Sequence, residues 1–219
     1  MIGSIVSPEL RQRVRGLATP IAVGFGRLGL SPNHLTLIGF GVAILAAVAA
    51  GSQAWLVAGL LLIVGGVFDL FDGALARATG KASKLGAFMD SVFDRAGEGV
   101  VYVGIAAGSV AAGFDAGAIL AAAAMAAAFM VSYVRAKSEG LGFTQGSGMA
   151  AVGMMPREVR LVILSLGLVL TDAPDIKALE FALAIIAIGA SITTIQRIVH
   201  VRNQASAPVT GRPTEQEHT

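Results

Sequence analysis

Long apolar stretches alternate with short polar links along most of the chain. Six stretches of about 18 to 26 residues have the length that a helix needs to cross roughly 30 Å of hydrocarbon. The shortest of them is the fifth. They lie near residues 35–51, 54–78, 84–108, 116–139, 159–170 with its flanks, and 179–201. The pattern predicts an all-α integral membrane protein with six transmembrane helices.

A different pattern precedes the first span. Between residues 7 and 28, basic and apolar side chains alternate in the way that is typical of a helix at the headgroup boundary of a membrane. The basic members are Arg11, Arg13, Arg15 and Arg27, and the apolar members are Val14, Leu17, Ile21 and Phe25. We therefore expect a juxtamembrane amphipathic segment over residues 1–30, a six-span domain over 31–203, and a polar, disordered tail over 204–219.

The composition of the chain supports a membrane protein. Of its 219 residues, 55% are hydrophobic and 14% are charged, whereas soluble domains average about 25% charged residues. The chain contains no cysteine, so disulfide and thiolate chemistry are excluded.

Basic residues fall almost entirely on one side of the predicted membrane. Of the 16 Lys and Arg residues, only Lys177 lies in a link on the opposite side. Because Lys and Arg are enriched in cytoplasmic loops, we expect a multi-pass protein of the cell membrane with both termini in the cytoplasm. The link between the second and third spans then also faces the cytoplasm.

Five acidic residues interrupt the second and third apolar stretches: Asp69, Asp72, Asp90, Asp94 and Glu98. An ionised carboxylate at the centre of a membrane helix costs about 2.5 to 3.5 kcal/mol on insertion scales. A cluster of them therefore needs positive charge nearby, and a bound divalent cation is one source of that charge.

The spacing of the four aspartates places them in two pairs. Asp69 and Asp72 are three positions apart, and Asp90 and Asp94 are four apart, so each pair lies on one face of its helix. The short link at residues 79–83 makes the two helices antiparallel neighbours, so the pairs face each other. An oxygen-only site favours Mg²⁺ or Mn²⁺ over zinc, and four carboxylates are enough for two ions.

Two other interpretations of the acidic cluster stay open at this point. Membrane transporters also keep buried acids, so the cluster could form an ion or proton relay. It could also form salt bridges between helices, with Arg77 and Arg95 as partners. Glu98 follows Asp94 by one helical turn and is either a partner of Arg95 or a polar contact between helices.

The aspartates belong to a longer motif, which reads Asp69-x2-Asp72-Gly73-x2-Ala76-Arg77-x8-Gly86-x3-Asp90-x3-Asp94. This motif resembles the signature of the CDP-alcohol phosphotransferases without a departure. The resemblance extends to the six spans and to the segment from Ser31 to Thr36 that opens the first span. It implies an enzyme that displaces CMP from a CDP-linked lipid with an alcohol.

The resemblance implies a role for each matching residue. Asp69, Asp72 and Asp90 would hold two divalent cations, and Asp94 would complete the second ion's ligands or act as the base for the acceptor hydroxyl. The residues implied in CDP-lipid binding are Gly73, Arg77 and Thr36, with Asn33 and Ser83 as weaker candidates.

Two features bear on the acceptor alcohol. The Asp94-Arg95 ending of the motif resembles the inositol phosphate branch of the family. Basic residues also recur beyond the motif, and in that branch such residues hold the acceptor's phosphate, for which arginine is well suited. The candidates are Arg135, Arg157, Arg160 and Arg197, with Lys137 weaker.

The chain departs from that branch in detail. It has Arg135-Ala136-Lys137 where the branch commonly has Lys-Ala-Arg, and Arg157-Glu158-Val159-Arg160 where the branch commonly has Arg-Pro-Glu-Arg. The alternative for these basic residues is that they anchor the spans to lipid headgroups.

We therefore expect a phosphatidyl transfer from CDP-diacylglycerol to inositol 1-phosphate, with Mg²⁺ or Mn²⁺ and no nucleic-acid partner. A homodimer is expected from the family. The alternatives are a phosphatidylglycerophosphate synthase, an archaetidylinositol phosphate synthase that uses an archaeal ether-lipid donor, or, from a different class, an ion or proton transporter.

Overall fold

The computed structural model describes residues 8–143, 152–171 and 177–206. All regular secondary structure in these ranges is helical, so the predicted all-α class is confirmed. The helices are α1 (Pro8–Arg27), α2 (Pro32–Gly51), α3 (Trp55–Ala78), α4 (Lys84–Ala111), α5 (Asp115–Gly140), α6 (Arg157–Val169) and α7 (Lys177–Ala205).

Four of these helices, α2, α3, α5 and α7, are long and apolar enough to cross a membrane. The two others that coincide with predicted spans differ from them. Helix α6 has only 13 residues, or about 20 Å at 1.5 Å per residue. Helix α4 has 28 residues but carries charged side chains along its first half. Crossing by α4 and α6 therefore stays a prediction.

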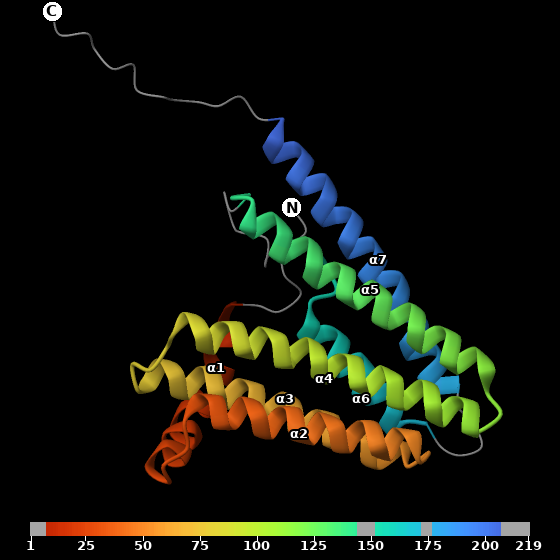
Figure 1. The fold of residues 1–219 in the computed structure, drawn as a ribbon, viewed down its shortest axis with the longest axis horizontal. Helices are drawn as coiled ribbons and strands as arrows, with labels where there is room; N and C mark the ends of the chain where they lie inside the picture. The colour runs from red at the N-terminus through yellow and green to blue at the C-terminus, as the bar shows by residue number, and fades with distance from the viewer. Residues whose placement is uncertain (1–7, 144–151, 172–176, 207–219) are drawn as a thin grey trace, which may run out of the picture.

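The helices form two groups that meet along α4. Helix α2 packs against both α3 and α4, and α5 packs against both α4 and α7. Figure 1 shows α2, α3 and α4 running side by side, with α5 and α7 lying together at an angle to them. Helix α6 contacts α3 and α7 and so links the two groups. The main core contains residues of all six helices from α2 to α7.

Close contact between α2 and α4 depends on two glycines. A Cβ atom on Gly104 would run into the backbone of Ala47, and one on Gly108 would run into the carbonyl oxygen of Ala50. Small residues allow helix backbones to approach in this way in membranes. The contact fixes α4, which carries Asp90 and Asp94, beside α2.

Helix α1 forms where the N-terminal amphipathic segment was predicted, and it packs against α3. Ala18 and Ala22 are buried in a small cluster with Leu35, Ala74 and Leu75. Its position at a membrane surface stays a prediction. The side chains of Arg11, Arg13 and Arg15 lie outside the described residues, as does the tail after Ser206; α7 itself runs two residues beyond the boundary predicted at 203.

Side-chain caps set the starts of α2 and α4, the helices that lie over the acidic cluster. Ser31 accepts a hydrogen bond from the His34 backbone N–H, and the Ser31 N–H donates to His34 Nδ1, both at 3.3 Å. This reciprocal box assigns His34 to helix capping. Ser83 accepts from the Gly86 N–H at 3.0 Å and begins α4.

Candidate active site

Helices α3 and α4 each bring one aspartate, Asp69 and Asp94, to the same guanidinium group. The predicted packing of these two helices against each other is wrong, because α2 packs against both of them instead. Asp69 and Asp94 border one small cavity, and Asp90 and Asp94 border a larger one. Among the described residues, however, no group of three or more acidic or histidine side chains is arranged as a ready metal site. Metal ligation by Asp69, Asp72, Asp90 and Asp94 therefore stays a prediction.

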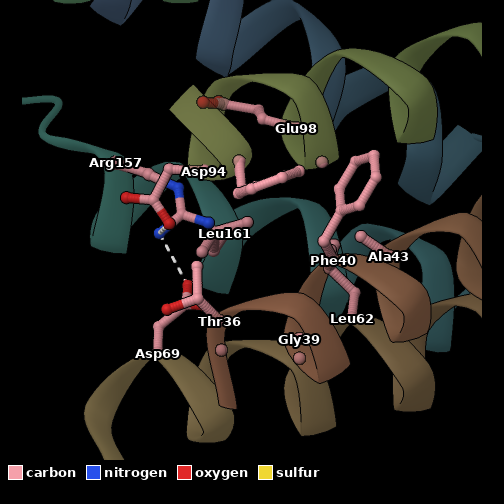
Figure 2. A pocket seen from close by; sticks show the side chains of 14 residues that line it. Thr36, Gly39, Phe40, Ala43, Leu62, Asp69, Asp94, Glu98, Arg157 and Leu161 are labelled. Carbon is pink, nitrogen blue, oxygen red and sulfur yellow. Dashed lines mark hydrogen bonds and ion pairs between the residues drawn. The ribbon is translucent and has the colours of Figure 1, made fainter. Parts of the chain in front are cut away.

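The guanidinium of Arg157 lies between the two aspartate pairs. Its Nη1 atom is 2.7 Å from Asp69 Oδ2 and 2.8 Å from Asp94 Oδ1, and Figure 2 shows the side chain between these carboxylates. Arg95 adds a contact of 3.3 Å to Asp94 Oδ2. The sequence suggested Arg77 and Arg95 as salt-bridge partners, so it identified Arg95 and missed Arg157.

Asp72 has a different partner. The Thr36 hydroxyl donates to Asp72 Oδ2 at 2.7 Å, with the Pro32 carbonyl 3.2 Å away as an alternative acceptor. Both side chains are buried. Because a buried carboxylate needs hydrogen-bond donors, Thr36 is part of what holds Asp72 in place.

The donor set suits a divalent cation. All four side chains offer carboxylate oxygen, which Mg²⁺ and Mn²⁺ prefer. A cationic nitrogen already lies between Asp69 and Asp94, which shows that this position accepts positive charge. The chemistry fits, although Arg157 holds the carboxylates in the structure.

The residues implied in CDP-lipid binding lie towards the end of α3 and at the starts of α2 and α4. Arg77 folds back over Gly73, whose missing Cβ would lie 3.2 Å from Arg77 Nη1. Asn33 and Ser83 both lie close to Gly86, where α2 and α4 begin. Thr36 is one turn further along α2. Their contact with a nucleotide stays a prediction.

A cavity of about 800 Å³ opens next to the aspartates. Asp90, Asp94 and Arg95 of α4 form one part of its wall, and residues of α5, α6 and α7 form the rest. All four arginines predicted to hold the acceptor's phosphate line it: Arg135, Arg157, Arg160 and Arg197.

These four arginines differ in how their guanidinium groups are occupied. Arg160 is 1% exposed and binds Glu98 through two hydrogen bonds of 2.7 Å. Arg197 is also buried and donates to the carbonyl oxygens of Val131 at 2.6 Å and Val152 at 3.0 Å. Arg135 is half-exposed and pairs with Glu139 at 2.9 Å. Their role toward an acceptor stays a prediction.

The ion pair with Arg160 shows the role of Glu98. Of the two roles open for Glu98, the contact between helices is the one observed, because α4 and α6 are joined through its carboxylate. The partner is Arg160, which the sequence suggested as an anion ligand or as an anchor to lipid headgroups. Spacing could not reveal the pair, since the two residues are 62 positions apart.

Comparison with known proteins identifies the class of protein. Residues 30–196 match the CDP-alcohol phosphatidyltransferase family. This range includes the whole aspartate motif and three quarters or more of the chain, and the chain belongs to this family. It is therefore an enzyme of the class that the motif predicted.

Two relatives within this family are named for the synthesis of inositol phosphate lipids. The chain is 33% identical over 201 residues to the archaetidylinositol phosphate synthase of Pyrococcus horikoshii, covering 92% of this chain and 97% of the relative. It is 35% identical over 198 residues to the phosphatidylinositol phosphate synthase of Streptomyces avermitilis, covering 86% of this chain and 79% of the relative.

Solved structures share the fold. The crystal structure of Mycobacterium tuberculosis phosphatidylinositol phosphate synthase with CDP-DAG bound matches with a TM-score of 0.72 and 26% identity, over 90% of this chain and 98% of that one. The same enzyme in complex with manganese and citrate matches with a TM-score of 0.73 and 26% identity, over 90% and 93%.

Proposed function

We propose that the enzyme transfers a phosphatidyl group from CDP-diacylglycerol to inositol 1-phosphate, releasing CMP and forming phosphatidylinositol phosphate. The observation that carries this proposal is the cavity of about 800 Å³ with aspartates on one wall and four arginines around it. A phosphorylated alcohol needs cationic groups beside the reacting carboxylates, and serine or choline would not. Relatives named for inositol phosphate products support the same choice.

Asp69, Asp72, Asp90 and Asp94 are proposed to hold Mg²⁺ or Mn²⁺, with two ions as the expected number. Manganese in the structure of a relative supports a divalent cation. When bound, such a cation neutralises charge on the donor's pyrophosphate and makes CMP a better leaving group.

Asp94 is proposed as the base, because it borders the cavity where the acceptor would lie. The acceptor's hydroxyl oxygen forms a bond to the β-phosphorus of the donor, the bond from that phosphorus to the oxygen of CMP breaks, and the hydroxyl proton passes to the Asp94 carboxylate. Thr36 keeps Asp72 in position. Residues Gly73, Arg77, Thr36, Asn33 and Ser83 are proposed to contact the nucleotide.

The similarity to an archaetidylinositol phosphate synthase supports a second candidate donor. In this alternative the CDP-linked lipid has ether-linked chains, while the acceptor and the site residues are unchanged. The apolar helix faces that would contact the chains do not distinguish ester from ether lipids.

The test is CMP release by the purified enzyme with Mg²⁺ and either donor, supplied with inositol 1-phosphate, glycerol 3-phosphate or serine in turn. We expect release with inositol 1-phosphate far above the others, and none from Asp94→Asn, a variant that keeps the side chain's shape. Equal release with glycerol 3-phosphate, or release with glycerol 3-phosphate alone, would reject the acceptor assignment. Comparing the two donors decides between ester and ether lipid.

We extend the proposal to the membrane arrangement. All six helices from α2 to α7 cross the membrane, the active site and both termini face the cytoplasm, and the enzyme forms a homodimer. The basic residues on one side support the orientation. Large exposed apolar side chains on α5 and α7, such as Ile119, Ile188 and Ile195, support contact with lipid or with a second copy.

A further inference from the structure

Arg157 lines two neighbouring cavities. It lines the large cavity together with the other arginines. It also lines a small cavity between α2, α3, α4 and α6, where Asp69 and Asp94 point toward it (Figure 2). Asp94 is shared by the two cavities in the same way. Arg157 therefore lies at the partition between the carboxylates and the space for an acceptor.

The contacts of Arg157 leave part of its hydrogen-bonding capacity unused. One nitrogen, Nη1, serves both Asp69 and Asp94. The Nε atom is buried and has no hydrogen-bond partner in the described part of the chain. A guanidinium has five N–H donors in a planar fork, so this ion pair does not satisfy it as fully as the Glu98 pair satisfies Arg160.

From this geometry we infer that Arg157 is an exchangeable counter-ion. It neutralises Asp69 and Asp94 while the divalent site is empty. When the cation binds, Arg157 leaves the carboxylates and turns its guanidinium into the large cavity, where it binds the phosphate of the acceptor. This inference rests on the proposed function for the identity of both ligands.

The exchange follows from the limited number of carboxylate oxygens. A divalent cation and a guanidinium nitrogen cannot both lie within bonding distance of the same Asp69 and Asp94 oxygens without strong repulsion. Arg157 is the first residue of α6 and already lines the cavity into which it would move. A change of side-chain rotamer is then enough, and no helix has to shift.

The other cavity arginines are less suited to this role. Arg160 and Arg197 are buried and bonded to groups of the core, and Arg135 contacts none of the aspartates in the described structure but pairs with Glu139. Exchange at Arg157 would therefore couple cation binding to anion binding. By thermodynamic linkage, each ligand must then tighten the other by the same factor.

The first measurement is Mn²⁺ binding to the purified enzyme without substrates, followed by the electron paramagnetic resonance signal of free Mn²⁺. Arg157→Gln removes the competitor, so we expect Mn²⁺ to bind roughly 5- to 150-fold more tightly, the usual range for coupled ligands. Lys137→Gln is the matched control: it removes one exposed positive charge from α5 and should leave Mn²⁺ affinity unchanged. Affinity in Arg157→Gln no higher than in wild type would overturn the inference.

The second measurement separates exchange from a fixed charge at this position. Binding of inositol 1-phosphate is titrated calorimetrically with and without Mn²⁺ in wild type and in Arg157→Lys, which keeps the charge but lacks the planar fork. We expect Mn²⁺ to tighten anion binding by a larger factor in wild type. If Mn²⁺ tightened anion binding by the same factor in both proteins, the inference would be overturned. This comparison does not use Arg157→Gln, so it can be made even if that variant does not fold.

Failure of the inference is distinguishable from failure of the proposed function. If wild type releases CMP with inositol 1-phosphate while Mn²⁺ affinity is the same in wild type and Arg157→Gln, only the exchange is rejected. If wild type releases no CMP with any acceptor, the proposed function is rejected.

Discussion

At the scale of single residues, the Glu98–Arg160 pair combines high burial with two direct hydrogen bonds. Both side chains are 1% exposed, and the Arg160 Nη1 atom also donates to the Met155 carbonyl oxygen at 3.1 Å. A buried charge that loses its partner is expensive, because neither water nor another ion replaces the lost contact. The pair therefore fixes α6, which begins at Arg157, against α4.

We expect Arg160→Gln to destabilise the enzyme by about 3 to 5 kcal/mol, since it leaves Glu98 buried and unpaired. The measurement is the apparent Tm in detergent, and pairing with Glu98→Gln in a double-mutant cycle should recover part of the loss. Arg135→Gln is the control, because its exposed pair with Glu139 is worth only about 0.3 to 0.5 kcal/mol. An unchanged Tm with a raised KM for the acceptor would instead make Arg160 an anion ligand.

The sequence predicted those site residues whose relation is local. Asp69 and Asp72 share a helical turn, as do Asp90 and Asp94, and one short link joins the two helices, so spacing alone placed the four carboxylates together. Of the arginine partners of the carboxylates, only Arg95, which is next to Asp94 in the sequence, could be found in this way. Arg157 lies 88 positions from Asp69, and its place depends on how α6 packs on α3, for which helical periodicity contains no information.

At the scale of elements, hydropathy located every helix from α2 to α7 because each has an apolar run of its own. It gave less information about α4 and α6. The charged side chains in α4 lower its apolar content, and α6 is only 13 residues long. Both helices line the site, which explains the weaker signal: residues that serve chemistry replace residues that favour lipid.

The contact between α2 and α4 yields a prediction at this scale. Gly104→Ala should destabilise the enzyme by about 1 to 3 kcal/mol, the usual cost of overpacking, because its Cβ would collide with the Ala47 backbone. Gly41→Ala is the matched control, since no heavy atom lies within 4 Å of its added Cβ, and alanine favours a helix over glycine.

The readouts for this pair are the apparent Tm in detergent and the rate of CMP release. We expect Gly104→Ala to lower both, because α4 carries Asp90 and Asp94 and a shift of α4 away from α2 moves them. Equal Tm values for Gly104→Ala and Gly41→Ala would show that the two helices separate without cost.

At the scale of the whole molecule, the chemistry gathers at one end of the helices. The link between α3 and α4 lies at the end where the aspartates are, whereas the links from α2 to α3 and from α4 to α5 lie at the other end (Figure 1). Both substrates of the proposed reaction carry charged phosphate groups, which the hydrocarbon excludes. A site at one end of the bundle lets the lipid chains stay in the membrane while the phosphates meet the aspartates near water.

The absence of cysteine from the sequence allows this arrangement to be tested with single introduced thiols. Lys81 lies in the link between α3 and α4, Ser52 lies in the link between α2 and α3, and both are exposed. If the aspartate end faces the cytoplasm, a membrane-impermeant maleimide should label Lys81→Cys only in inside-out vesicles and Ser52→Cys only in right-side-out vesicles. Both variants should still release CMP, because neither residue belongs to the proposed site. The opposite labelling pattern would reverse the proposed orientation, and labelling of both thiols from the same side would show that α3 does not cross the membrane.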